Sequence, residues 1–340
     1  MRFLQTKTLY DNMQSILLTR FNVAVLAAAL FFCSTASQAL AQTYPTKPIR
    51  VVVAYAPGGS TDIAARMIGE ELGQALGWRV VIDNRAGGGT IIGTETVARA
   101  TPDGYTLFYG TNAMVINTVL QDKVPYDPVR DFEPVAIAIV QPLAVLAGPR
   151  VKVNTMQALI SNAKANPGKL NFASSGNGSL QHIAGELLRN MASLNIVHVP
   201  YKGAGPAMID LLGGNVDFMI TSLLGTMEHI KSGRLKLLAT TGSRRSQANP
   251  DVPTVAESGL PGYEAISWQA FFAPAKTSKT VVDRLNSALQ QVAGSKSLND
   301  KIAANGMELK ISSPSELRDL VLKEQKKYAA IVKKTGAKIE

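Results

Sequence analysis

The sequence predicts an α/β protein of two lobes, connected by two crossing strands that form a hinge. Short apolar segments rich in β-branched residues alternate with segments whose apolar residues recur at helical spacing, a pattern typical of sheets covered by helices. The alternation is interrupted near residue 134, and the chain returns to the first lobe near residue 266. A chain of 340 residues also exceeds what one hydrophobic core usually supports.

The first lobe is predicted to begin with repeated strand–turn–helix units. Residues 49–55 read as a strand, a glycine turn follows, and apolar residues over 63–72 recur at helical spacing. A strand at 78–83, a second glycine turn and a helix at 91–100 repeat the unit, and a third strand follows at 106–109. We therefore expect a parallel sheet here, with helices on both faces.

The crossing to the second lobe is predicted at Gln141-Pro142, which separates apolar strands at 134–140 and 143–147. Residues 268–273 return the chain to the first lobe, where helices starting near Val281 and at Ser315 close it. The predicted boundaries are 42–142 with 266–340 for the first lobe and 143–265 for the second. Within the second lobe we expect helices at 156–165, 180–191, 205–212 and 227–231, and strands at 170–173, 196–199, 216–221 and 235–240.

Residues 1–41 are predicted to be a cleaved signal peptide, which would direct the protein to the periplasm. A weakly basic start precedes an apolar stretch over 21–33 and a small-residue tract that ends in Ala39-Leu40-Ala41. The apolar stretch is shorter than the roughly 20 residues that a membrane span needs, which argues against an anchor. Phe32 before Cys33 argues against a lipid on that cysteine, because a small residue is expected there.

Composition excludes several kinds of chemistry. Cys33 is the only cysteine and would leave with the signal peptide, so disulfides, thiolate nucleophiles and cysteine metal sites are not expected. The three histidines fit no zinc spacing, and we predict neither a metal nor a cofactor. The net charge of +10 is dispersed and not interleaved with aromatic residues, which argues against nucleic acid and suits attraction of an anionic solute.

Three glycine-rich turns between a strand and a helix are the candidate binding elements. They are Pro57-Gly58-Gly59-Ser60-Thr61-Asp62, Gly87-Gly88-Gly89-Thr90 and Ser174-Ser175-Gly176-Asn177-Gly178-Ser179. Ligands of open α/β sheets bind outside the carboxyl ends of strands, where glycine lets the backbone approach and helix amides favour an anion. One such turn is no more than a helix start, but three predict a site for a small carboxylate. Neither a P-loop nor a dinucleotide motif is present.

Three individual side chains have two interpretations each. Asp62 is either an acid in the first turn of a helix, which we favour, or a polar group of the cleft. His182 is either a structural helix histidine or a ligand contact. Asp217 interrupts an apolar strand, so it either holds a loop or meets an amine of the ligand.

A serine hydrolase is the alternative from the enzyme class. Ser161-Asn162-Ala163-Lys164, Ser175-Gly176-Asn177 and Lys334-Thr335-Gly336 match, in order, the motifs of penicillin-recognising enzymes. The first two lie too close together, and the third has no strand around it, so we favour a protein without catalytic activity. A periplasmic sensor domain is a further alternative.

The chain resembles the tripartite tricarboxylate transporter substrate-binding family, also called the TctC or Bug family. The resemblance covers the whole chain after the signal peptide. The motifs that carry it include Tyr55-Ala56-Pro57-Gly58-Gly59, Asn84-Arg85-Ala86-Gly87-Gly88-Gly89, Pro102-Asp103-Gly104-Tyr105, Asp131-Phe132-Glu133-Pro134, Ser174-Ser175-Gly176-Asn177-Gly178-Ser179, Val199-Pro200-Tyr201-Lys202-Gly203 and Pro253-Thr254-Val255.

The resemblance implies a two-lobe fold like that of type II periplasmic binding proteins, which binds an organic acid, and we expect a monomer. It implies delivery to a membrane permease with one large and one small subunit, or signalling to a sensor kinase. Known ligands of the family are citrate-like acids, acidic amino acids and aromatic carboxylates. The predicted ligand-binding residues are Tyr55, Pro57, Gly58, Gly59, Ser60, Thr61, Gly88, Thr111, Ser174, Ser175, Gly176, Gly178, Ser179, His182, Lys202, Gly203 and Asp217.

Overall fold

The computed structural model describes residues 44–121, 123–223, 225–245 and 249–335. The predicted signal peptide lies outside these residues. The described residues from Lys47 onwards form one compact unit. Within the described residues, no helix has the length and apolar character that a membrane crossing requires.

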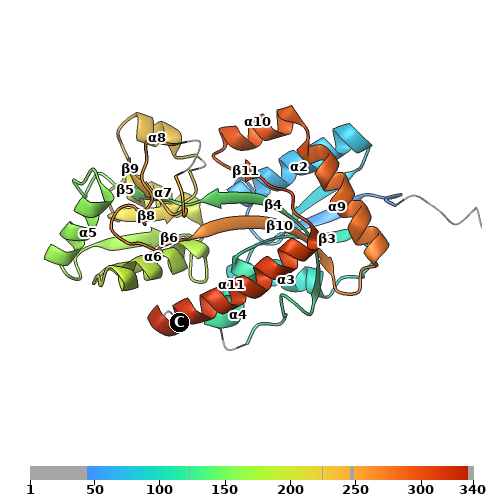
Figure 1. The fold of residues 1–340 in the computed structure, drawn as a ribbon, viewed down its shortest axis with the longest axis horizontal. Coiled ribbons are helices and arrows are strands. Elements are labelled where there is room, and N and C mark those ends of the chain that lie inside the picture. Colours follow the sequence, from blue (N-terminus) through green and yellow to red (C-terminus); the bar gives the residue numbers. More distant parts are fainter. Residues whose placement is uncertain (1–43, 122, 224, 246–248, 336–340) are drawn as a thin grey trace, which may run out of the picture. The chain divides into compact units, whose positions relative to one another are not determined.

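The first sheet has the strand order β11-β4-β10-β3-β1-β2 (Figure 1). Strands β1 (Ile49–Val53), β2 (Val80–Asn84) and β3 (Thr106–Thr111) are parallel to one another, as the strand–helix alternation predicts. Strand β10 (Ile266–Pro274) is antiparallel to β3 and to β4 (Phe132–Pro142), and the short β11 (Glu308–Leu309) is antiparallel to β4. The sheet is therefore mixed, not parallel.

The helices of the first sheet follow the predicted pattern in part. Helices α2 (Ser60–Leu76) and α3 (Ile91–Ala98), the latter preceded by the short turn η1 (Gly88–Thr90), lie where expected. Helix α4 (Ala113–Leu120) was not predicted, because it is short and largely apolar and follows β3 directly. The closing segment forms three helices instead of two: α9 (Lys279–Ala293), α10 (Lys296–Ala304) and α11 (Pro314–Thr335).

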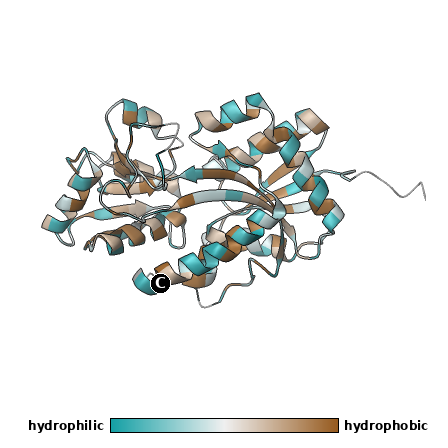
Figure 2. Cartoon of the chain, viewed as in Figure 1, coloured by the Kyte–Doolittle hydropathy of each residue, from teal (hydrophilic) through white to brown (hydrophobic). Residues whose placement is uncertain are grey.

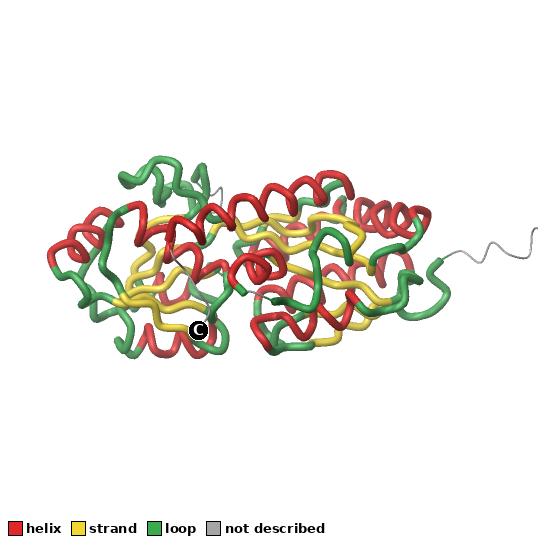
Figure 3. The backbone as a smooth tube through the Cα atoms, turned by 90° about the horizontal axis from the view of Figure 1, so that it is seen from below, coloured by secondary structure: helices red, strands yellow, loops and turns green. Residues whose placement is uncertain are grey.

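The second sheet has the order β7-β6-β8-β5-β9. Strand β6 (Asn171–Ser174) is parallel to β7 (Val197–Pro200) and β8 (Phe218–Thr221), whereas β5 (Ala144–Ala147) is antiparallel to β8 and to β9 (Lys236–Thr240). The helices of this part are α5 (Met156–Ala165), α6 (Leu180–Met191), α7 (Ala204–Leu212) and α8 (Met227–Lys231). Figure 3 shows the strands gathered in two groups with helices around them.

The chain passes between the sheets twice, as predicted. Strand β4 ends at Pro142 and β5 begins at Ala144, while β10 begins at Ile266, which pairs with Pro142. Thr241 joins both passages. Its hydroxyl accepts from Leu143 N at 2.7 Å and donates to Ala265 O at 2.6 Å, and Ala265 N donates to Thr241 O at 2.9 Å.

A continuous apolar core holds these elements in place. It includes Phe108 and Phe272 of the first sheet and Phe172 and Phe218 of the second, all fully or nearly fully buried. In a smaller apolar cluster, Leu211 of α7 packs together with Met219 of β8. Figure 2 shows apolar residues concentrated in the strands, and helices with hydrophilic residues along one side. Since burial of apolar area is the main stabilising contribution to folding, this core fixes the strand ends from which the glycine turns extend.

Candidate functional site

The first glycine turn connects β1 to α2 and is held by Asp62. This carboxylate is only 3 % exposed and accepts hydrogen bonds from Gly58 N (2.9 Å), Arg66 Nε (3.0 Å) and Asn84 Nδ2 (3.0 Å). Burial alone would raise the pKa of Asp62, but these hydrogen bonds from Arg66, Gly58 and Asn84 outweigh it and keep the pKa below its ordinary value. Asp62 is therefore the helix-turn acid that we favoured, and it fixes the conformation of the turn.

Because Asp62 already uses the amide of Gly58, the amides left at this turn are those of Gly59, Ser60 and Thr61. Gly59 precedes α2 with φ −81° and no side-chain cap, and both Gly58 and Gly59 are exposed. The first amides of a helix have no partner within it, so an uncapped start can donate to an anion. Gly58 has φ +87°, a conformation that favours glycine.

The second glycine turn precedes α3 and is supported by Asn117 of α4. Asn117 is fully buried and donates from Nδ2 to Gly89 O at 2.7 Å and to Thr90 Oγ1 at 3.3 Å. Thr90 has φ 85° and caps α3 with its backbone alone. Gly87, Gly88 and Gly89 are exposed. The start of α3 thus also lacks a side-chain cap.

The third turn follows β6 and begins with the fully buried Ser174. Ser179 caps α6 by accepting from His182 N at 3.2 Å, and its hydroxyl donates to Gly176 O at 2.6 Å. The backbone bonds from Tyr201 N to Ser174 O and from Gly203 N to Ser175 O, both 3.1 Å, bring the segment around Lys202 beside it. Helix α7 begins after Gly203 without a side-chain cap.

Two stacked histidines lie beneath the third turn. The rings of His182 and His198 are 4.2 Å apart at 12°, and His198 Nε2 lies 2.7 Å from Ser174 Oγ. His182 Nδ1 accepts from Gly178 N at 3.4 Å. Burial lowers the pKa of His182 to about 4 and that of His198 to about 3, with further lowering by Arg189. His182 therefore supports the turn as a neutral ring, which is the structural interpretation of this residue.

The turns of the two sheets meet. A Cβ atom at Gly89, in the second turn, would lie 3.6 Å from Asn177 O, in the third. At the end of β1 and β3, Tyr55 and Thr111 pair through their hydroxyl oxygens at 2.8 Å. Burial raises the pKa of the Tyr55 hydroxyl, which stays neutral. The second and third turns thus approach each other at Gly89 and Asn177, and Tyr55 pairs with Thr111.

Asp217 does not belong to this group, and its inclusion among the ligand contacts is corrected here. It lies before β8 and accepts from Asn171 N at 2.8 Å, at the start of β6, whereas the third turn follows the end of β6. Its other oxygen pairs with Arg150 at 3.1 Å, and its own amide donates to Asn171 Oδ1 at 2.9 Å. With 2 % exposure, Asp217 joins two strand starts and is not available to a ligand.

The motifs of the hydrolase alternative are not assembled. Ser161 and Lys164 are exposed on α5, Ser175 lies in the turn after β6, and Lys334 lies near the end of α11. In the described residues no hydrogen bond or ion pair connects these side chains. Ser175 Oγ instead donates to Gln181 at 3.1 Å.

Sequence reasoning missed several buried polar side chains near the turns or the passages between the sheets. The side-chain oxygens of Gln141 and Gln269 are buried and make no hydrogen bond to another described residue, and the buried Tyr126 hydroxyl lies beside Asn117 and Thr94. Gln269 pairs in register with Thr111, and burial raises the pKa of Tyr126, beside Asn117, to about 12. Polar residues inside otherwise apolar strands, as at Gln141 and Gln269, were the available signal.

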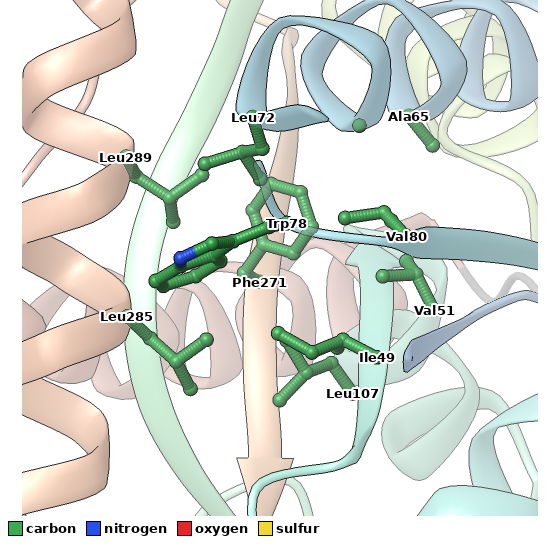
Figure 4. Close-up of a pocket in the computed structure, with 11 residues that line it drawn as sticks. Ile49, Val51, Ala65, Leu72, Trp78, Val80, Leu107, Phe271, Leu285 and Leu289 are labelled. Atoms are coloured by element: carbon green, nitrogen blue, oxygen red, sulfur yellow. The ribbon is translucent and has the colours of Figure 1, made fainter. Parts of the chain in front are cut away.

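Two hollows lie elsewhere. The first is an apolar cavity of about 10 Å³ between α2, α9 and the first sheet, lined by Trp78, Phe271, Leu285 and others (Figure 4). That volume is at the lower limit for one water, so it is a packing gap. The second is an open groove of about 450 Å³ between α4 and α11, lined by Tyr126 and Lys326 among others. Neither is lined by the glycine turns.

Two sheets joined by two passages, with glycine turns that meet between them, define the class of periplasmic solute-binding proteins. The sequence model described as "Tripartite tricarboxylate transporter family receptor" (TctC) matches residues 64–337. Protein BugT of Bordetella pertussis is 38 % identical over 322 residues, which cover 94 % of this chain and 98 % of BugT. The chain therefore belongs to the TctC family of solute-binding receptors, as the sequence motifs predicted.

Solved structures of similar proteins agree. The periplasmic binding protein BugD is 34 % identical with a TM-score of 0.80, covering 87 % of this chain and all of BugD. A Rhodopseudomonas palustris protein solved with adipate is 33 % identical (TM-score 0.82; 87 % and 100 % coverage). MatC of the same organism, solved with malate, is 31 % identical (TM-score 0.78; 85 % and 100 % coverage). The family model is thus described as a receptor and BugD as a periplasmic binding protein.

Proposed function

We propose that this protein captures a small organic acid between the glycine turns of its two sheets and delivers it to a membrane permease with one large and one small subunit. The ligand is a di- or tricarboxylate, an acidic amino acid or an aromatic carboxylate. The two-lobe division at residues 42–142 with 266–340 and 143–265, and export to the periplasm after cleavage behind Ala41, are parts of the same proposal.

One observation carries the proposal: α2 and α3 start at the first two turns without a side-chain cap, and α7 starts without one beside the third turn, although α6, at the third turn itself, is capped by Ser179. The first amides of α2 and α7 have no side-chain partner, whereas at the start of α3 the amide of Ile91 already donates to Gly88 O. Each helix start favours an anion by about 0.3–1 kcal/mol, and hydrogen bonds to a charged group add about 1.5–3 kcal/mol each. A few such bonds are compatible with micromolar affinity, about −8 kcal/mol.

The cations near the turns are largely engaged, which favours recognition through neutral donors. Arg66 is paired with Asp62 and Arg85 with Asp83. Lys202 is exposed beside the third turn and is the side-chain cation that we expect to face an anionic ligand. The adipate and malate held by the two solved relatives support a dicarboxylate as the first ligand to test.

The test is a thermal-shift screen against adipate, malate, citrate, acidic amino acids and benzoate, followed by calorimetry. A ligand at a hundredfold excess over its Kd should stabilise the protein by about 2.7 kcal/mol. Gly59→Leu should abolish binding while the fold is kept, because the backbone there is extended and the nearest atom to the new Cβ lies 4.0 Å away. Gly294→Leu, at the exposed end of α9 with φ −72°, is the matched control. Unchanged affinity in Gly59→Leu would refute the placement of the site.

A further inference from the structure

Asn112 is a buried residue at which three parts of the fold converge. It follows Thr111 at the end of β3 and precedes α4, with 1 % exposure. Its Nδ2 donates to Ile266 O at 3.1 Å and to Tyr328 OH at 2.9 Å, and its Oδ1 accepts from Trp268 N at 3.0 Å. One side chain thus ties a strand end of the candidate site to the crossing strand β10 and to α11.

A buried carboxylate completes this arrangement. Glu324 of α11, 5 % exposed, lies 3.1 Å from Asn112 Nδ2, whose two hydrogens are shared among Glu324, Ile266 O and Tyr328 OH; it also accepts from Trp268 Nε1 at 3.4 Å and pairs with Lys327 at 3.4 Å. We call Asn112, Trp268, Glu324 and Tyr328 the hinge network. Removing one member leaves other buried polar groups unpaired, which costs about 1–3 kcal/mol per group.

The hinge network lies where the second passage enters the first sheet. Ala265 is bonded to Thr241, at the end of the second sheet, and Trp268 is bonded to Asn112, in the first. Because Ile266 already pairs with Pro142 in the first sheet and its carbonyl accepts from Asn112, a rotation of one sheet relative to the other along this passage must occur close to Ala265 and Ile266. The network holds Ile266 and Trp268 to Asn112, so these residues move with the first sheet.

The same helix reaches the second sheet. Helix α11 packs against β4 and α4, and also against α6, where Asn190 Nδ2 donates to Lys334 O at 3.2 Å. Helix α6 starts at the third glycine turn. On the side of the candidate site, Thr111 Oγ1, next to Asn112 in the chain, accepts from Ala113 N at 3.3 Å and pairs with the hydroxyl of Tyr55. Polar contacts thus connect the candidate site with the passage between the sheets.

We propose that Asn112 is a positioning residue: through the hinge network it holds β10 against α11 and keeps the two sheets in the relative orientation that lets their turns share a ligand. This inference rests on the proposed function, in which the turns of both sheets bind one acid. If loss of the network lowers the fraction of binding-competent molecules to about a tenth, the apparent Kd rises about tenfold.

The test measures the distance between the sheets with two spin labels. Labels on Lys164→Cys of α5 and Lys301→Cys of α10, both exposed positions, are placed in a Cys33→Ser chain, which has no other cysteine. We compare Asn112→Ala with Glu324→Gln, which keeps an oxygen for Asn112 and Trp268. The matched control is Asn286→Ala, which removes bonds to Val135 O (2.9 Å) and Ser312 O (2.8 Å) away from the passages.

We expect Asn112→Ala to broaden the distance distribution of the ligand-free protein and to raise the Kd of the acid about tenfold. Glu324→Gln should stay close to the unmodified protein, and Asn286→Ala should lose thermal stability without a change in distance. An unaltered distribution in Asn112→Ala would overturn the inference. Because the distance is read without ligand, this result stands even if no acid binds, an outcome that would refute the proposed function alone.

Discussion

Acidification should weaken the fold through His182. The ordinary pKa of a histidine is 6.5, and burial beneath the third turn lowers that of His182 to about 4. The neutral ring is therefore favoured in the folded protein, while the unfolded chain takes up its proton first. The stabilisation from this residue is fully present above pH 6.5 and is lost as the pH falls towards 4.

The magnitude follows from the two pKa values. Between pH 7.5 and 5, the unfolded chain gains about 2 kcal/mol relative to the folded protein from this one group. The protonated ring would also face Arg189 and the stacked ring of His198, and its Nδ1 would lose the ability to accept from Gly178 N. The third glycine turn should loosen before the protein unfolds.

The assay is urea unfolding at several pH values in the unmodified protein and in His182→Asn, whose amide oxygen replaces Nδ1 as acceptor. As the pH falls from 7.5 to 5, the free energy of unfolding of the unmodified protein should fall by about 2 kcal/mol more than that of His182→Asn. His229→Asn, on α8 and outside the turn, serves as the control. A difference that stays constant with pH would refute this account of the histidine pair.

Three further outcomes follow from contacts at or beside the turns. Asp62→Asn removes the charge that pairs with Arg66, and we expect a loss of about 1–3 kcal/mol in urea unfolding together with weaker ligand binding. Asp217→Asn should destabilise the protein but change the calorimetric Kd of acidic amino acids and of plain diacids equally; a selective loss for amino acids would contradict its structural role. Gly185→Ala should cost about 1–3 kcal/mol in thermal unfolding, because the new Cβ would lie 2.0 Å from the ring of Phe172; full stability would show that β6 and α6 can separate without cost.

Local patterns in the sequence predicted the units that carry the glycine turns. The β1–α2 unit lies within a few residues of its expected bounds, because a β-branched run, a glycine turn and an amphipathic stretch are all local signals. Strand direction was not predictable in the same way. Strand β10 is apolar and buried like a parallel strand, yet it runs antiparallel to both neighbours because it returns from the other sheet.

The site was predictable where backbone conformation decides it and not where distant side chains meet. Glycines marked the three turns, but spacing could not reveal that Asp62 uses the amide of Gly58 or that two histidines support the third turn. Asn112 and Glu324 are separated by more than 200 residues along the chain and meet only in the folded protein. Asp217 was misplaced because an acid in an apolar strand signals a partner without saying whether that partner is protein or ligand.

The bonds of Thr241 bear on how this architecture can be recombined. Leu143 and Ala265 are both bonded to this one residue, so the segment between them leaves and rejoins the rest of the chain at nearly one point. A segment with adjacent ends can be exchanged as a cassette, since no new connection has to be built. Grafting residues 143–265 from a relative with a known ligand would combine the third glycine turn of that relative with the first two turns of this protein in a single chain.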